Sequence, residues 1–185
     1  MPSYLNSFNQ IDGAMVHMVQ SIGSQWYGVA WFLSAIVGYS PFLIPAMVLA
    51  LVLTGKYRVA IEAVGISLLA LAAVYLSKAL IWAPRPFWVD SSVIRYAFES
   101  SSGMPSGHAL VSFVILGWVW LRHPKSAILS VGIPVTIFLV GLSRVYLGVH
   151  YPSQVIVGWI VGAFMLWAFW RIDRLLFRPR SGYVK

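Results

Sequence analysis

Two histidines and three cationic residues lie beside helix-breaking residues in three separate stretches of the chain. Residues 101–109 read SSGMPSGHA and place a Pro, a Ser and a Gly immediately before His108 and a long apolar run. Pro105 cannot continue a helix, Ser106 is a favoured N-cap, and Gly107 lets a ligand approach the backbone closely. The free N–H groups of a first helical turn favour an anion. This stretch therefore predicts an anion site with an imidazole beside it.

A second stretch, residues 78–86, reads KALIWAPRP and places two cations at the end of an apolar segment. Lys78 can offer a point charge to a phosphate, and Arg85 can offer a planar fork of N–H donors. Basic residues at such positions also reach for water at a membrane surface without binding any ligand. On its own, this stretch is compatible with either interpretation.

The third stretch, residues 143–154, reads SRVYLGVHYPSQ. Arg144 lies inside an apolar segment, where a charge costs on the order of 2.5 kcal/mol or more, so we expect it to contact an anion. That anion is a ligand or, alternatively, the carboxylate of Glu99 or Asp90. His150 precedes a Pro that can start a helix, and Gln154 follows one turn later, where its amide can face the ring.

The composition indicates an integral membrane protein. Of 185 residues, 59% are hydrophobic and 10% are charged, and the mean hydropathy is +0.80; in soluble proteins about a quarter of residues are charged. The net charge of +8 is unevenly distributed, so we do not expect nucleic acid as a partner. There is no Cys for disulfides or thiolate chemistry. The first residues lack the basic region of a cleaved signal peptide, and we expect a single domain over residues 1–185.

Seven segments predict an all-α fold. Residues 5–22 repeat apolar side chains every three or four positions, which predicts an amphipathic helix at the membrane interface. Residues 26–38 are apolar but too short to span, so we expect an interfacial or partly inserted helix. Five further runs predict transmembrane helices: residues 41–54, 59–82, 106–121, 127–147 and 152–177. The fold class is therefore an integral membrane helical bundle with five crossings, or six if residues 26–38 also cross.

The distribution of basic residues predicts the orientation. We divide the chain into interfacial helices (1–38), a transmembrane core (41–177) and a cytoplasmic tail (178–185), with a polar loop over residues 87–104. With five crossings, nine of the 13 basic residues fall on one side, which is cytoplasmic by the positive-inside rule: Lys56, Arg58, Arg122, Lys125, Arg171, Arg174, Arg178, Arg180 and Lys185. The other four fall on the outer side with both histidines of the motifs: Lys78, Arg85, Arg95 and Arg144. We therefore expect three segment ends to deliver their polar residues to one outer face of the cytoplasmic membrane.

In order and spacing, the three stretches resemble the signature of the type-2 phosphatidic acid phosphatase superfamily, K-x6-RP, PSGH and SR-x5-H. The matching positions are Lys78, Arg85, Pro86, Pro105, Ser106, Gly107, His108, Ser143, Arg144 and His150. The short chain and its five-span layout look most like the bacterial undecaprenyl-diphosphate phosphatases of this superfamily.

The resemblance implies a role for each of these residues. His150 would attack phosphorus to give a phosphohistidine, and His108 would protonate the leaving oxygen. The phosphate would be held by Lys78, Arg85, Arg144, Ser106 and the backbone N–H of Gly107. Elementary chemistry agrees, because phosphoryl transfer needs positioning and charge neutralisation, and a neutral imidazole is a competent nucleophile near pH 7. Covalent capture makes a metal unnecessary, so we expect no metal and no cofactor.

Gln154 departs from the commonest family pattern, in which an Asp stands four residues after the nucleophile. A carboxylate would orient the ring and stabilise its imidazolium form, whereas an amide can only orient it. Branches that resemble dolichyl diphosphatases and glucose-6-phosphatase also use Gln here. We therefore assign Gln154 to the catalytic group, as the residue that orients His150.

The resulting hypothesis is a lipid phosphatase that acts on a lipid phosphate at the bilayer surface, with undecaprenyl diphosphate, a lipid of cell-wall biogenesis, as the first candidate. The alternatives are phosphatidylglycerophosphate or phosphatidic acid as substrate, or transfer of the phosphoryl group to a lipid acceptor. From another class, the chain would be a catalytically silent lipid-binding or transport protein. The residues predict neither the lipid nor the oligomeric state.

Overall fold

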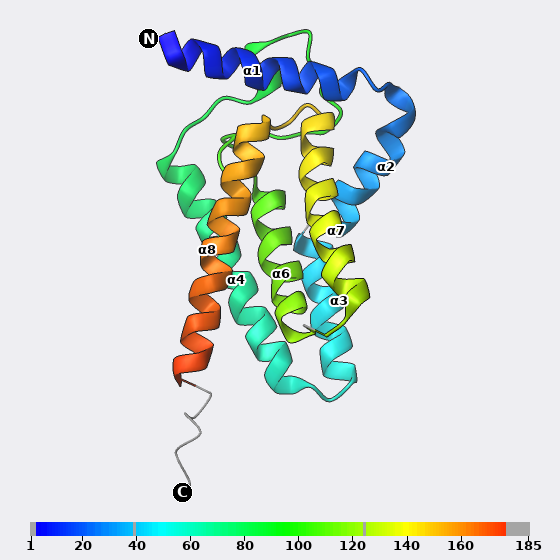
Figure 1. Cartoon of the computed structure of the whole chain (residues 1–185), viewed down its shortest axis with the longest axis vertical. Helices are drawn as coiled ribbons and strands as arrows, with labels where there is room; N and C mark the ends of the chain where they lie inside the picture. Colours follow the sequence, from blue (N-terminus) through cyan, green and yellow to red (C-terminus); the bar gives the residue numbers. More distant parts are fainter. Residues whose placement is uncertain (1–2, 39, 124, 177–185) are drawn as a thin grey trace, which may run out of the picture.

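The computed structural model describes residues 3–38, 40–123 and 125–176 and consists of helices that stand side by side beneath one transverse helix (Figure 1). The bundle contains α3 (Ser40–Leu53), α4 (Tyr57–Leu80), α6 (Gly107–Arg122), α7 (Ala127–Tyr146) and α8 (Pro152–Leu176). The five predicted runs are confirmed as helices to within about two residues at each end, except that residue 177 lies outside the described part. Within that part the fold is all-α.

α6 is the central helix of the bundle, because it packs against α4, α7 and α8. Its buried side includes Leu110, Val114 and Ile115, which form a core with Ile66 and Ala70 of α4. Small residues let the backbones approach closely: a Cβ added at Gly158 of α8 would lie 2.8 Å from the carbonyl oxygen of Ser106. The first turn of α6, which carries the PSGH motif, is thereby fixed against α8.

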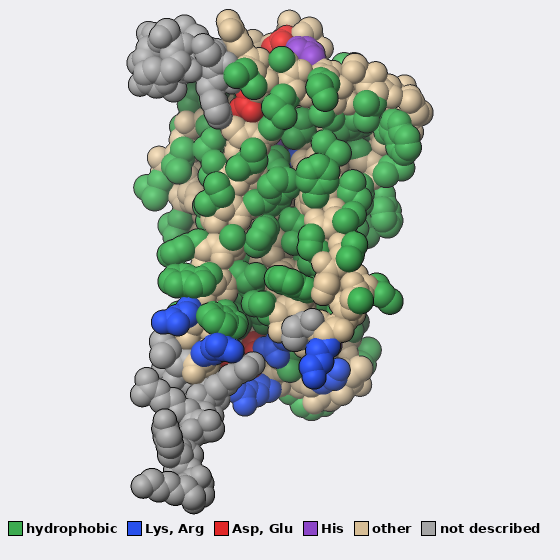
Figure 2. Space-filling model, viewed as in Figure 1, with side chains coloured by type: hydrophobic (Ala, Val, Ile, Leu, Met, Phe, Trp, Pro, Cys, Tyr) green, Lys and Arg blue, Asp and Glu red, His purple; other side chains and the backbone are tan. Residues whose placement is uncertain are grey.

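Three helices, α4, α7 and α8, are long and apolar enough to cross a membrane. α6 and the described apolar part of α3 are shorter. On the face shown in Figure 2, apolar side chains cover the length of the bundle, and Lys and Arg side chains gather at the end opposite α1. Three of the predicted cytoplasmic cations, Arg178, Arg180 and Lys185, lie outside the described residues. The number of crossings stays a prediction.

The N-terminal amphipathic prediction corresponds to α1 (Ser3–Gln20), which lies across the end of the bundle where the polar loops gather (Figure 1). Its polar side chains bind those loops. Asp12 accepts hydrogen bonds from the backbone N–H and hydroxyl of Ser153, at the start of α8. Gln20 donates to the carbonyl oxygens of Ile94 and Tyr146. α1 therefore fastens the loops that carry two of the three motifs.

Residues 24–37 form three short helical pieces: η1 (Ser24–Trp26), α2 (Tyr27–Phe32) and the π-turn η2 (Leu33–Val37). α2 and η2 pack against α7 and lead down the side of the bundle toward α3 (Figure 1). The predicted loop 87–104 needs one correction, because it begins inside a helical turn, α5 (Pro86–Val89). The turn forms because Pro86 occupies its first position, where the missing N–H has no partner to lose.

Candidate active site

His150 lies between α7 and α8 and is 1% exposed. Its Nδ1 lies 2.9 Å from the carbonyl oxygen of Gly103 and 3.1 Å from Oε1 of Gln154. The Gln154 amide is oriented by its own Nε2, which donates to the carbonyl oxygen of Pro84 at 2.7 Å. Both neighbours of Nδ1 are acceptors, so the proton belongs on Nδ1. Nε2 then keeps its lone pair, 3.3 Å from the donor Nη1 of Arg85.

The electrostatic surroundings keep this ring neutral. Burial, and then the nearby cations Arg144 and Arg85, hold the pKa of His150 well below its usual 6.5, and Gln154 opposes the shift. A neutral imidazole with an unprotonated Nε2 is the nucleophilic form of histidine. Gln154 therefore faces the ring as the spacing predicted.

Arg85 is fully buried beside the ring. Its Nε donates to the carbonyl oxygen of Ser101 at 2.7 Å, and Nη1 donates to that of Val149 at 2.7 Å. Its Nη2 lies 3.2 Å from the carbonyl oxygen of Ser102 and 3.4 Å from Oε2 of Glu99. Burial lowers the pKa of the guanidinium, and the carboxylate of Glu99 opposes that shift. The guanidinium is thus held mainly by carbonyl groups of the polar loop.

Lys78 reaches the same loop from the last turn of α4. Its Nζ donates to the carbonyl oxygen of Ser102 at 2.6 Å and to Oγ of Ser101 at 3.0 Å. Residues 101 and 102 therefore accept hydrogen bonds from both cations of the KALIWAPRP stretch. This arrangement differs from two cations that each extend separately into water.

Arg144, in the last turn of α7, has two side-chain partners. Nη2 donates to Oε1 of Glu99 at 2.5 Å, and Nη1 donates to Oγ of Ser34 at 2.5 Å. Nε is buried without a hydrogen-bond partner among the described residues. The sequence left Glu99 and Asp90 as possible carboxylate partners of Arg144. The partner is Glu99, whereas Asp90 pairs with His17 at 2.9 Å.

The PSGH motif starts α6. Ser106 occupies the N-cap position, as predicted, but its side chain does not cap the helix. Its Oγ is buried and has no partner among the described residues, while its N–H donates to the carbonyl oxygen of Gln154 at 3.0 Å. A Cβ added at Gly107 would lie 3.1 Å from a methyl group of Val74 of α4, so a larger residue here would crowd the contact between the two helices.

These groups surround one cavity of about 270 Å³ at the α1 end of the bundle. Both histidines of the motifs line it with Lys78 and Gly107, and Arg85 and Arg144 contact its wall through His150 and Glu99. α4 contributes an apolar side through Leu71, Val74 and Tyr75. The fold therefore brings the three motifs, far apart in sequence, to a single polar cavity.

A comparison with known families identifies the group of proteins to which these motifs belong. The sequence model of the PAP2 superfamily matches residues 59–178, which include all three motifs. The chain belongs to the PAP2 superfamily. The resemblance drawn from residues 78–150 is therefore confirmed at the level of the family.

Individual PAP2 relatives agree with this assignment. The chain is 32% identical over 124 residues to the undecaprenyl-diphosphatase of Sulfolobus acidocaldarius, covering 66% of this chain and 59% of that one. It is 32% identical over 142 residues to the dolichyldiphosphatase of Saccharomyces cerevisiae, covering 71% of this chain and 59% of the yeast protein. Among solved structures, the PAP2-type phosphatidylglycerolphosphate phosphatase of Bacillus subtilis superposes with a TM-score of 0.73 at 27% identity, covering 95% and 90% of the two chains. The chain spans less than two thirds of the length of the first two relatives.

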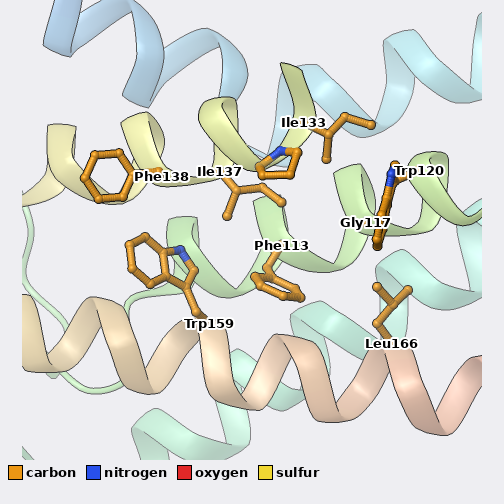
Figure 3. A pocket seen from close by; sticks show the side chains of 9 residues that line it. Phe113, Gly117, Trp120, Ile133, Ile137, Phe138, Trp159 and Leu166 are labelled. Atoms are coloured by element: carbon orange, nitrogen blue, oxygen red, sulfur yellow. The ribbon is translucent and has the colours of Figure 1, made fainter. Parts of the chain in front are cut away.

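A second cavity, of about 290 Å³, lies on the other side of α6. Figure 3 shows side chains of α6, α7 and α8 that surround it, among them Phe113, Ile137, Trp159 and Leu166. Its lining is apolar except for the indole N–H groups, and none of the PAP2 motif residues reaches it. Its lining provides no charged group to bind a phosphate.

Several residues at the PAP2 site were not predicted as site residues from the sequence. Ser101 and Ser102 bind the two cations mainly through backbone carbonyls, which every residue has, and Ser101 adds its hydroxyl. Ser34 comes from the short η2, where no motif marks it. Gly103 lies so close to Gln154 that an added Cβ would be 2.6 Å from its Nε2. The SSG run before PSGH was the only sequence signal for this loop.

Proposed function

We propose that the chain is a lipid phosphatase that removes a phosphate from a lipid phosphate through a covalent intermediate on His150. The observation that supports this most directly is the state of its ring. Nδ1 is held by two acceptors, the pKa is depressed, and the ring lines a cavity together with Lys78, with Nη1 of Arg85 3.3 Å from its Nε2. Such a ring is ready to attack an electrophilic phosphorus.

In the first step, Nε2 of His150 attacks phosphorus and the bond to the leaving oxygen breaks. His108 gives a proton to that oxygen, so the lipid leaves as a neutral alcohol or as a lipid phosphate. In this proposal, cations and hydrogen-bond donors neutralise the charge on the phosphoryl oxygens: Lys78, Arg85, Arg144, the hydroxyl of Ser106 and the N–H of Gly107. The unpartnered Oγ of Ser106 and Nε of Arg144 are donors that a phosphate would satisfy.

In the second step, water attacks the phosphohistidine. His108 now accepts a proton from the water, the P–N bond breaks, and inorganic phosphate is formed while His150 regains its lone pair. Gln154 holds the ring in one orientation in both steps through Oε1. An alcohol in place of water would make the same site a phosphotransferase.

The proposed substrate is a prenyl diphosphate such as undecaprenyl diphosphate. Two of the relatives are named for prenyl diphosphates, an undecaprenyl-diphosphatase and a dolichyldiphosphatase. The B. subtilis structure supports phosphatidylglycerophosphate as the second candidate. The apolar side of the cavity on α4, where Tyr75 is 72% exposed on the outer surface, provides a path for the hydrocarbon chain. By the positive-inside rule we place this cavity on the outer side of the cytoplasmic membrane.

The test is phosphate release by the purified protein in detergent from undecaprenyl diphosphate, phosphatidylglycerophosphate and phosphatidic acid. We expect the prenyl diphosphate to be hydrolysed best, with full activity in EDTA, inhibition by orthovanadate, and a loss of at least about four orders of magnitude in His150→Ala. A ³²P label that stays on the denatured wild-type protein but not on His150→Ala would identify the intermediate. No release from any of the three lipids would leave the lipid-binding or transport alternative.

A further inference from the structure

Glu99 places a carboxylate between the two arginines of the candidate phosphate site. Oε1 accepts from Nη2 of Arg144 at 2.5 Å, and Oε2 accepts from Nη2 of Arg85 at 3.4 Å. The side chain lines the polar cavity and is 23% exposed, while both arginines are buried. An anion that bridges two guanidinium groups inside this cavity takes a place that the phosphoryl group of a substrate needs.

The other partners of Arg85 are much harder to exchange, because most of them are backbone carbonyl oxygens. Apart from Glu99, a serine hydroxyl and the His150 ring, Arg85 is held by backbone carbonyl oxygens: two in the polar loop, at residues 101 and 102, and one between α7 and α8, at residue 149. Glu99 instead lies in a segment without regular secondary structure, and rotation of its side chain would release both arginines. Nε of Arg144 is buried without a hydrogen-bond partner among the described residues, so Glu99 binds only part of that guanidinium. Glu99 thus satisfies only part of what a tetrahedral oxyanion would satisfy.

We propose that Glu99 is a resident anion of the site: it holds Arg85 and Arg144 in the absence of substrate, and it competes with the phosphoryl group for them. This inference rests on the proposed function of the same cavity. When a phosphate enters, the carboxylate gives up its hydrogen bonds to Nη2 of each arginine and turns away. When the product is inorganic phosphate, the return of the carboxylate favours its release.

The competition makes a prediction opposite to that of a structural role. If Glu99 only supported the arginines, removing its charge would loosen them and weaken the binding of phosphate. If it competes with phosphate, removing its charge frees two donors and takes away a like charge, so phosphate binds more tightly. The neutral, isosteric change Glu99→Gln separates the two roles by the sign of its effect.

The measurement is the inhibition constant of orthovanadate and of inorganic phosphate against lipid phosphate hydrolysis. We expect Glu99→Gln to lower both constants by about tenfold and to lower KM, with no gain in kcat because the product leaves more slowly. The matched control is Asp90→Asn, which removes the same charge from the same loop at a carboxylate that contacts His17 and Ser92 instead. It should leave both constants unchanged.

Inhibition constants that stay the same or rise in Glu99→Gln would overturn the proposal. An equal fall of these constants in Asp90→Asn would also overturn it, because the effect would then come from the net charge of the loop. If Glu99→Gln does not fold, Glu99→Asp replaces it. Its shorter side chain cannot bridge both arginines, so the inhibition constants should again fall. Unchanged inhibition constants in the folded Glu99→Asp protein would refute the competition.

The two proposals fail in different ways. Without any hydrolysis by the wild type, the proposed function fails, and titration calorimetry of orthovanadate with the wild type and Glu99→Gln still measures the competition. With hydrolysis that depends on His150 and no tightening in Glu99→Gln, only the role of Glu99 fails.

Discussion

The two cavities of this molecule have nearly the same volume and share α6 as a wall, yet their chemistry is opposite. One, of about 270 Å³, contains both motif histidines, a lysine and a glutamate; the other, of about 290 Å³, is apolar. The helical period explains the division, because His108 and Val111 lie on one face of α6 and Phe113 and Gly117 lie on the opposite face. Volume alone therefore does not identify the functional site.

What distinguishes the polar cavity is the loop that closes it. Residues 99–103 provide the acceptors for Lys78 and Arg85, the carboxylate for Arg144 and the carbonyl for Nδ1 of His150. The apolar cavity lies between helices, away from any such loop, and only side-chain packing surrounds it (Figure 3). Changes at the first cavity should therefore act on catalysis, and changes at the second should act on stability.

Among the residues that surround the nucleophile, the largest effect on activity is expected at Arg144. Arg144→Ala removes a buried cation from the phosphate site and leaves Glu99 without its 2.5 Å partner. We expect kcat/KM for lipid phosphate to fall by about 10²- to 10³-fold, as for loss of one donor that stabilises transition-state charge. Arg144→Lys, which keeps the charge but not the fork, should fall in between. Equal activity of the alanine variant and the wild type would show that this guanidinium does not contact the phosphoryl group.

A smaller effect is expected at Gln154, which orients the nucleophile without touching phosphorus. Gln154→Ala removes the Oε1 acceptor and should lower kcat by about tenfold, since one neutral hydrogen bond is lost and Gly103 still holds Nδ1. Gln154→Asp restores an acceptor and should lose less activity than Gln154→Ala. If both variants have the same kcat, this residue does not orient the ring.

The polar cavity also shows which parts of the site the sequence can predict. The helices follow from hydropathy and Pro positions, and the side chains of the motifs follow from residue type: His150 faces Gln154 because they are one turn apart. Three residues of the site were missed. Ser34 acts through a hydroxyl on a helix that no motif marks, Ser101 acts mainly through its carbonyl, and Gly103 matters because Gln154 lies close against its backbone. None of these leaves a pattern in one sequence, because Ser101 and Gly103 depend on how the loop folds over the cations and Ser34 depends on how η2 packs against α7.

The surroundings of His150 in the polar cavity also predict how activity depends on pH. Burial and the cations Arg144 and Arg85 lower the pKa of His150 below 6.5, so its lone pair is lost only when the pH falls well below that value. Protonation of this ring should therefore lower kcat/KM with a midpoint below pH 6.5 in the wild type. In Arg144→Ala one lowering charge is gone, and the fall should move to higher pH. A wild-type midpoint at or above 6.5 would contradict a buried, neutral nucleophile.

The smallest effect on activity is expected on the apolar side of α6. Ile137 is 8% exposed and lines the second cavity, so Ile137→Ala enlarges a space that is already present. We expect a loss of about 2–5 kcal/mol in the free energy of unfolding, measured in detergent, with kcat/KM within about twofold of the wild type. Val111→Ala makes a similar truncation at the polar cavity, where Val111 is 3% exposed, and should lower kcat/KM as well. If Ile137→Ala reduces kcat/KM as much as Val111→Ala does, the two faces of α6 are coupled and the separation of catalysis from packing is wrong.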